Sequence, residues 1–346
     1  MKTLIDGLAD LTGLRDHDAL DFAFTKLVRT LHQPHPVIVR LVRIVGEPGD
    51  QRCMICALLE TQDIEPKRDA AWTDWDTLPT LASFPIREAA IMGGGKSECA
   101  ATPVPTTVFL IEKNAVTALL LELETVQPLE QAEKDVIQSV LQVYKNLLGL
   151  LDYGEKDALT ELLNRKTFDG AFFKAAADQD TVGELGHPGR RAYSPGKSYW
   201  LAVLDIDHFK RVNDSFGHLI GDEVLLLLAQ LMRNSFRFHD QLYRFGGEEF
   251  VVLMRCAAHS DAVSTLERFR NQVEKHIFPQ VGTITVSAGF AALADNDTPG
   301  GAFGRADKAV YYAKGHGRNQ VCSYLALVEA GELEEQVVES NNVDLF

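Results

Sequence analysis

Apolar residues recur in a helical pattern near the start of the chain and then in short strand-like runs. Between residues 18 and 31 they occupy one face of a helix, and Asp18 is a candidate N-cap for that helix. Four apolar runs each predict a strand, at residues 37–45, 53–59, 106–112 and 115–124. A helix, two strands, an irregular middle and two more strands predict an α+β domain over residues 1–127.

A long helix is predicted over residues 129–153, and it has two apolar faces. One face has the heptad spacing of a coiled coil and consists of Val136, Val140, Val143, Leu147 and Leu150. The other would let the helix pack on its own domain and consists of Ile137, Leu141, Tyr144, Leu148 and Leu151. Both faces can be used at once. We expect residues 128–156 to form a linker helix that pairs in a parallel homodimer.

The second half of the chain alternates between strand and helix patterns. Helices are predicted at residues 209–216, 221–236, 260–273 and 303–314, and strands at 199–206, 283–289 and 320–325. We expect an antiparallel sheet flanked by helices over residues 157–328. Residues 178–197 are polar and rich in Gly and Pro, which predicts a surface insertion, and the acidic tail at 329–346 predicts disorder.

Paired carboxylates follow two apolar segments of this half. The run that starts at Tyr199 ends in Asp205 and Asp207, which share one strand face. About forty residues later the pair Gly246-Gly247 predicts a tight hairpin turn, because adjacent glycines supply positive φ angles. Glu248 and Glu249 follow the turn on opposite faces. Carboxylates at a strand end and at a neighbouring turn are suited to binding Mg²⁺.

The charge balance excludes some functions. The formal net charge is −15, which argues against nucleic-acid binding because that function needs a basic surface. It is compatible with nucleotide binding, where Mg²⁺ and a few lysines neutralise the phosphates. No apolar run reaches the roughly eighteen residues of a membrane span, and the acidic start, with Asp6 and Asp10, does not resemble a signal peptide. We expect a cytoplasmic protein.

Two short motifs resemble redox, zinc or phosphate-binding sites but are better explained by structural roles. Cys53 and Cys56 have redox or zinc half-site spacing, but no second pair of ligands follows, and their apolar surroundings favour a buried strand. The segment from Gly93 to Ser97 matches the last residues of the phosphate-binding loop motif. The full motif requires a glycine where Ala90 stands, so a surface loop is the favoured interpretation.

From about Asp157 to Val321 the chain resembles the GGDEF family of diguanylate cyclases. The signature reads Gly-Gly-Glu-Glu-Phe at residues 246–250. Further motifs of the family are matched in order at residues 157–165, 205–223, 286–289 and 306–319. No departure from the family pattern argues for an inactive enzyme. The resemblance implies the ferredoxin-like palm of nucleotide cyclases and the condensation of two GTP molecules into cyclic di-GMP and two pyrophosphates.

The resemblance also implies roles for individual residues. Metal ligands, for two Mg²⁺ ions per site with Mn²⁺ as a substitute, would be Asp205, the Ile206 carbonyl and Glu248. Glu249 would help to activate the 3′-hydroxyl or complete the metal site, and Lys314 would also be catalytic. GTP contacts would come from Phe209, Lys210, Asn213, Asp222, Gly246, Gly247, Lys314 and Arg318, with Asn213 and Asp222 reading guanine. Singly, several of these fit structural roles: Lys314 and Arg318 suit a basic helix end.

Regulation is implied as well. Arg237 and Asp240 match the family's Arg-x-x-Asp inhibitory motif, with five residues between Asp240 and Gly246, and Arg268 matches its second arginine. Because one domain binds one GTP, catalysis would need two domains. The first domain resembles a GAF sensor for an unknown small ligand, with a PAS domain as the alternative.

A catalytically silent receptor of GTP or cyclic di-GMP is a competing function for the protein. A cyclic di-GMP hydrolase would require a further domain.

Overall fold

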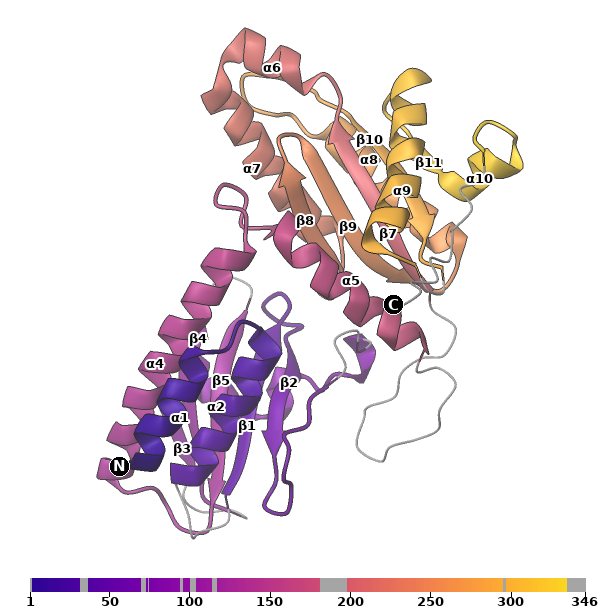
Figure 1. Cartoon of the computed structure of the whole chain (residues 1–346). Coiled ribbons are helices and arrows are strands. Elements are labelled where there is room, and N and C mark those ends of the chain that lie inside the picture. The colour runs from indigo at the N-terminus through magenta and orange to yellow at the C-terminus, as the bar shows by residue number, and fades with distance from the viewer. Residues whose placement is uncertain are drawn as a thin grey trace. The chain divides into compact units, whose positions relative to one another are not determined.

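The protein consists of two compact units (Figure 1). The computed structural model describes residues 2–31, 37–69, 73, 75–93, 96–99, 104–113, 117–180, 198–294 and 297–334. The first unit extends to Gly154 and the second starts at Glu155. None of the helices in the described ranges has the length and apolar character needed to cross a bilayer.

The first unit is a five-stranded antiparallel sheet in the order β2-β1-β5-β4-β3. Its strands are β1 (Val37–Val45), β2 (Arg52–Leu59), β3 (Lys96–Cys99), β4 (Thr106–Lys113) and β5 (Ala118–Thr125). Three helices bury their apolar sides on one face, and these are α1 (Lys2–Thr12), α2 (His17–Leu31) and α4 (Gln131–Glu155). Helix α3 (Pro85–Met92) and the 3₁₀ turn Leu81–Ser83 lie on the other face, and a second 3₁₀ turn is formed by Trp75–Thr77.

The long helix α4 is part of the core of the first unit. Ile137, Tyr144 and Leu148 are buried, and the Tyr144 ring stacks on Phe24 with centroids 4.1 Å apart. The face expected to pack on its own domain therefore does so, and the helix is not a free-standing linker. Of the heptad face, Val140 is buried as well, whereas Val136 and Leu150 are exposed.

The two neighbouring cysteines lie on opposite faces of the first sheet. Cys53 is buried in the cluster beneath α3, whereas Cys56 packs against the cluster beneath α2 and α4. A bulge separates them, because Leu41 pairs with Ala57 while Val42 pairs with Ile55. Burial raises the pKa of the Cys56 thiol to about 11. This placement supports the structural interpretation of the pair.

The second unit is a six-stranded sheet in the order β11-β10-β7-β9-β8-β6. Its strands are β6 (Leu163–Asn164), β7 (Ser198–Ile206), β8 (Gln241–Gly246), β9 (Glu249–Cys256), β10 (Val286–Ala292) and β11 (Val321–Ser323). The four central strands are antiparallel. The expectation of an all-antiparallel sheet is wrong at both edges, where β6 joins β8 and β11 joins β10 in parallel. Helix-containing crossovers, which parallel pairing requires, connect both pairs.

Helices cover both faces of this sheet (Figure 1). They are α5 (Arg165–Asp180), α6 (Phe209–Phe216), α7 (His218–Ser235), α8 (His259–Lys275), α9 (Pro299–Gly315) and α10 (Tyr324–Glu329). Leu228 of α7 and Phe269 of α8 join the largest apolar cluster on one face. On the other face α9 packs directly on β10. The two backbones are so close that a Cβ at Gly289 would come within 2.3 Å of the Ala306 carbonyl oxygen. Glycine at that position therefore allows the backbones of α9 and β10 to come close together.

Several boundaries differ from expectation. The strand expected at residues 320–325 ends at Ser323, whose hydroxyl caps α10 by accepting from the Ala326 N–H. Helices α1 and α3 and strand β3 were not predicted. Most of the expected insertion, residues 181–197, lies outside the described residues, as do residues 335–346 of the tail and Gly94 and Gly95 of the glycine-rich loop.

Candidate active site

Four charged side chains meet where β7 ends beside the β8–β9 hairpin. Asp205 is buried near the end of β7, and the antiparallel register places it opposite Glu249 at the start of β9. Glu248 lies in the turn itself. From α9, the Lys314 Nζ atom lies 2.7 Å from Asp205 Oδ2. The structure thus brings together the predicted metal ligands and the predicted catalytic lysine.

The site contains more negative charge than its one lysine offsets. Burial raises the pKa of Asp205; Lys314 opposes this effect, and Glu249 and Asp207 add to it. Burial likewise raises the pKa of Glu248, and the neighbouring Asp205 raises it further. Carboxyl groups that repel one another in a partly buried site are suited to a divalent cation, which would favour their charged forms.

This donor set fits Mg²⁺ bound together with a nucleotide. Among the described residues, no group of three or more His, Cys, Asp or Glu side chains forms a complete metal site. Mg²⁺ typically takes one or two protein carboxylates and completes its shell with substrate phosphates and water. Asp205 and Glu248 match that pattern, and the Ile206 carbonyl at the end of β7 remains a predicted third ligand.

The hairpin turn has the backbone that its glycines were expected to supply. Gly246 and Gly247 have φ angles of +149° and +52°. Arg244 braces the turn: its Nε and Nη2 atoms donate to the Gly247 carbonyl at 3.1 and 3.0 Å. Its Nη1 atom donates at 3.0 Å to Asp157 Oδ1, which also accepts from the Thr160 N–H and hydroxyl. The family's opening motif is thereby joined to the turn that contains Glu248.

The predicted guanine-reading residues lie at the junction of α6 and α7. His208, at φ +58°, turns the chain from β7 into α6. Phe209 is buried, whereas Lys210 is exposed in the first turn of the helix. Asn213 packs so closely on α7 that a Cβ at Gly221 would lie 2.0 Å from its Oδ1 atom. Gly221 therefore allows the Asn213 side chain to pack against α7 at the position that precedes Asp222.

The predicted phosphate contacts lie at the end of α9 and in the turn after it. Lys314 belongs to the last turn of the helix, and α9 ends at Gly315. Arg318 is exposed and lies beyond the helix, in a turn where Gly317, Arg318 and Asn319 all have positive φ. Arg318 thus lies beyond the last residue of α9, and its N–H donates to the Ala313 carbonyl at the end of the helix at 3.0 Å. Its contact with phosphate stays a prediction.

The three residues of the predicted inhibitory motif also lie together. Asp240 is buried, and its Oδ2 atom accepts from the Arg237 N–H at 2.9 Å. Burial raises the pKa of Asp240 to about 6, against the opposing charges of Arg237 and Arg268. Arg268 is on α8 and donates to the Ser235 carbonyl at 2.9 Å.

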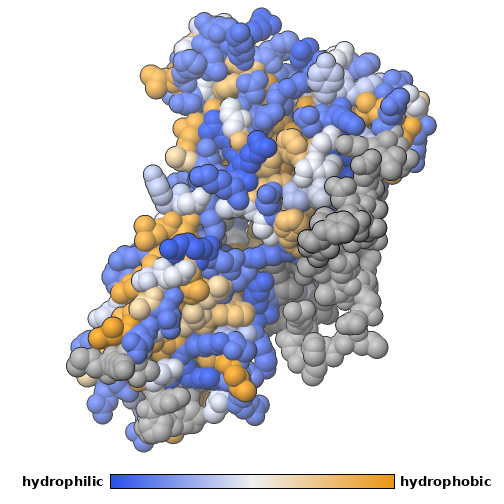
Figure 2. All heavy atoms as spheres, in the orientation of Figure 1, coloured by the Kyte–Doolittle hydropathy of each residue, from blue (hydrophilic) through white to orange (hydrophobic). Residues whose placement is uncertain are grey.

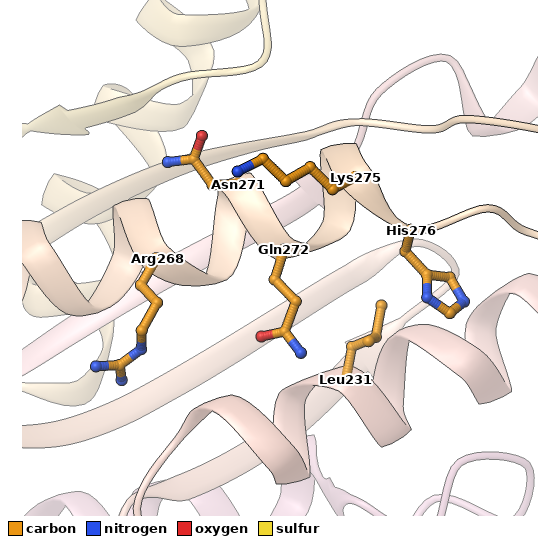
Figure 3. Close-up of a pocket in the computed structure, with 6 residues that line it drawn as sticks. All are labelled: Leu231, Arg268, Asn271, Gln272, Lys275 and His276. Atoms are coloured by element: carbon orange, nitrogen blue, oxygen red, sulfur yellow. The ribbon is translucent and has the colours of Figure 1, made fainter.

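A pocket of about 480 Å³ adjoins Arg268 (Figure 3). Besides Arg268, its lining comprises Asn271, Gln272 and Lys275 of α8, His276 after the helix, and Leu231 of α7. In this view the side chains of Arg268 and Gln272 extend from α8 toward α7, and His276 lies just past the end of α8. The pocket therefore places the positive charges of Arg268 and Lys275 beside the predicted inhibitory motif.

Asp240→Asn is expected to increase the free energy of unfolding at neutral pH. Because the pKa of Asp240 is higher in the folded protein than the usual 3.8, the folded state binds more protons and loses stability as the pH rises from about 4 to above about 6. Asparagine keeps an oxygen for the Arg237 N–H and cannot ionise. Urea denaturation should show a gain of roughly 1–3 kcal/mol at pH 7.5 that vanishes near pH 4. An equal gain at both pH values would contradict the explanation.

Comparisons with known proteins identify a family for the part of the chain that contains this site. The sequence model of one family, described as diguanylate cyclase, GGDEF domain, matches residues 155–320. The diguanylate cyclase DgcP of Pseudomonas aeruginosa is 45% identical over 194 residues, which cover 55% of this chain and 28% of DgcP. The response regulator PleD of Caulobacter vibrioides is 38% identical over 182 residues, covering 51% of this chain and 37% of PleD.

Among solved structures, the GGDEF domain of DgcB from Caulobacter crescentus in complex with c-di-GMP is 34% identical, with a TM-score of 0.44. The match covers 49% of this chain and 96% of that domain. The chain spans less than two fifths of the length of the two curated relatives. The match to the family model falls within the second unit. Residues 155–320 of this protein are a GGDEF domain of the diguanylate cyclase family.

Proposed function

We propose that the protein condenses two GTP molecules into cyclic di-GMP and releases two pyrophosphates. The main support is the cluster of Asp205, Glu248 and Glu249 around Lys314, with Lys314 Nζ 2.7 Å from Asp205 Oδ2. The proposed guanine-reading residues at the α6–α7 junction lie between Asp205 and Glu248 in sequence, and the turn with Arg318 follows Lys314, so all belong to the same domain. Such an arrangement suits phosphoryl transfer, which depends on positioning and charge neutralisation.

In this reaction each 3′-hydroxyl attacks the α-phosphorus of the other GTP. Asp205, Glu248 and the Ile206 carbonyl would hold the divalent ions, two per site, Mg²⁺ or Mn²⁺. When bound, these ions would neutralise phosphate charge and favour loss of the hydroxyl proton. Lys314 and Arg318 contribute positive charge for the phosphates, and Lys210 contributes at the start of α6. Glu249 is the candidate acceptor for the hydroxyl proton.

Guanine selectivity follows from the hydrogen-bonding groups of Asn213 and Asp222. A carboxylate at Asp222 can accept from the N1 and N2 hydrogens of guanine. Adenine lacks both donors in that arrangement, and an acceptor that the ligand covers without supplying a donor is costly. Phe209, Gly246 and Gly247 complete the proposed GTP contacts. The two glycines let a ligand approach the backbone with no side chain in the way.

Incubation with GTP and Mg²⁺, followed by chromatography of the products, tests the function. Formation of cyclic di-GMP and pyrophosphate is expected. Binding of GTP without turnover would instead establish the alternative, a catalytically silent receptor.

We further propose that the first unit, residues 1–127, is a GAF-like or PAS-like sensor of a small ligand. The protein would act as a homodimer through residues 128–156. The support is the heptad face of α4, where Val136 and Leu150 remain exposed and Val143 and Leu147 are only half-buried in the monomer. In Figure 2 apolar groups gather over the helical face of the first unit. Two such helices would bring two GTP sites into one assembly.

Val143→Asp is expected to weaken the dimer, because it places like charges across an apolar interface. Light scattering at several concentrations should show the variant dissociating where the wild type does not. Leu150→Asp, at a position exposed in the monomer, should act in the same way without affecting the core. Gln138→Asp, on the opposite exposed side of α4, is the matched control. Dimers of unchanged stability in both seam variants would rule out this interface.

A further inference from the structure

The carboxylate of Asp207 is occupied by protein groups, although it lies two residues after Asp205. Its Oδ1 atom accepts from the Ser287 hydroxyl at 2.7 Å, and its Oδ2 atom accepts from the Thr285 hydroxyl at 2.6 Å. Oδ2 also accepts from the backbone N–H of Asn319 at 3.0 Å. The side chain is buried. Asp207 thus joins the end of β7 to the start of β10 and to the turn after α9.

The turn after α9 has an unfavourable backbone conformation. Gly317, Arg318 and Asn319 have φ angles of +105°, +62° and +46° in succession. A non-glycine residue in the left-handed region is strained, and two in a row persist only where neighbouring groups fix them. The Arg318 N–H donates to the Ala313 carbonyl at 3.0 Å, which closes the turn against α9.

Asn319 is fixed through its side chain as well as its backbone. Its Oδ1 atom accepts from Arg270 Nη1 at 2.7 Å, and its Nδ2 atom donates to Glu274 Oε1 at 2.9 Å. Arg270 is itself bound to Glu267 and Glu274, one turn to either side on α8. The turn is therefore anchored to α8 on one side and to the end of β7 on the other.

We propose that Asp207 and Asn319 are positioning residues that hold this turn so that Arg318 is placed for the phosphates of GTP. The assignment rests on the proposed function, since Arg318 is the turn's proposed ligand contact. It separates the two acids of the Asp205–Asp207 pair: Asp205 belongs to the charged cluster with Lys314, and Asp207 anchors the backbone that presents Arg318. Asp207 acts through Arg318 and not through the metal ions.

Two substitutions of Asp207 distinguish an anchor from a metal ligand. Asparagine can place its oxygen where Oδ2 accepts two hydrogen bonds, and its amide can donate to the Ser287 hydroxyl. Asp207→Asn should therefore preserve the turn, whereas Asp207→Ala removes all three hydrogen bonds. Affinity for α,β-methylene-GTP, which cannot be turned over at the α-phosphorus, is measured by calorimetry, together with kcat and KM for GTP.

With Asp207→Ala, we expect KM and the analogue's dissociation constant to rise about tenfold, because a displaced contact loses much of its binding energy. With Asp207→Asn, most of that affinity should return. Arg318→Met should reproduce the loss, and adding Asp207→Ala to it should weaken binding little further, because residues that act as a unit are not additive. Asn319→Ala should weaken binding in the same direction.

Two results would overturn the proposal. If Asp207→Asn is as inactive as Asp205→Asn and needs more Mg²⁺, Asp207 is a metal ligand. If the losses from Asp207→Ala and Arg318→Met add fully, Asp207 does not act through Arg318. Failure of the proposed function looks different: the wild type would make no cyclic di-GMP, while the analogue affinities would still show whether the turn is anchored as described.

Discussion

Glu248→Gln is expected to abolish cyclic di-GMP synthesis while leaving the fold intact. Glu248 lies in the hairpin turn beside Asp205 and Lys314, where it would bind the divalent ions. Removing one ligand charge should cost several kcal/mol of transition-state stabilisation, or roughly a hundredfold or more in rate. Product formation from GTP and Mg²⁺, followed by chromatography, measures the effect. Retention of more than about a tenth of the wild-type rate would remove Glu248 from this role.

The same substitution should have the opposite effect on stability without metal. Because burial and Asp205 raise the pKa of Glu248, its charged form destabilises the folded state at neutral pH. Glutamine removes that charge, so Glu248→Gln should melt at a higher temperature than the wild type in EDTA. Adding Mg²⁺ with a GTP analogue should stabilise the variant less. Glu329→Gln, at the end of α10, is the matched control and should change neither property.

Arg237→Ala is expected to relieve product inhibition. Arg237 is exposed beside the buried Asp240, and Arg268 acts on the same carboxyl from α8. We propose that cyclic di-GMP binds here, with the Arg237 guanidinium donating to guanine or phosphate and Asp240 accepting from a guanine edge. Losing a charge-assisted pair should cost about 2 kcal/mol, or roughly thirtyfold in affinity.

Calorimetric titration of cyclic di-GMP into both proteins measures this change. At equal initial rates, the variant should accumulate more product than the wild type, because product bound at this site would lower the rate without competing with GTP. Arg15→Ala, at an exposed arginine of the first unit, is the control and should bind product as the wild type does. Equal affinities for Arg237→Ala and the wild type would show that the motif only terminates α7 and shapes the following turn.

Local patterns predicted the elements around the site because the relevant residues are close in sequence. The Gly-Gly hairpin, the acid-terminated β7 and the helices that follow were all recognisable from spacing and periodicity. The roles of Asp205 and Asp207 were not separable in this way. Both share a strand face, and only the positions of Ser287 and Asn319, distant along the chain, show that Asp207 is already bound by protein groups.

Other features of the site depended equally on distant partners. Arg244 lies within the recognised hairpin, yet nothing in the sequence indicated that it bridges Gly247 and Asp157. The parallel edge strands were missed because pairing direction depends on how the intervening helices cross the sheet. Gly289 had one usable signal, a glycine inside a strand, which is typical of a close backbone approach.

The bridge made by Arg244 has a mechanical consequence. The first residues of the GGDEF domain, around Asp157, share a side chain with the turn that contains Glu248, so they cannot shift separately without breaking charge-assisted hydrogen bonds. A rotation applied at residues 155–157 would therefore move the hairpin and its carboxylates as one rigid body. We expect a conformational signal that reaches the domain at residues 155–157 to change the orientation of the hairpin and to leave the geometry within the hairpin unchanged.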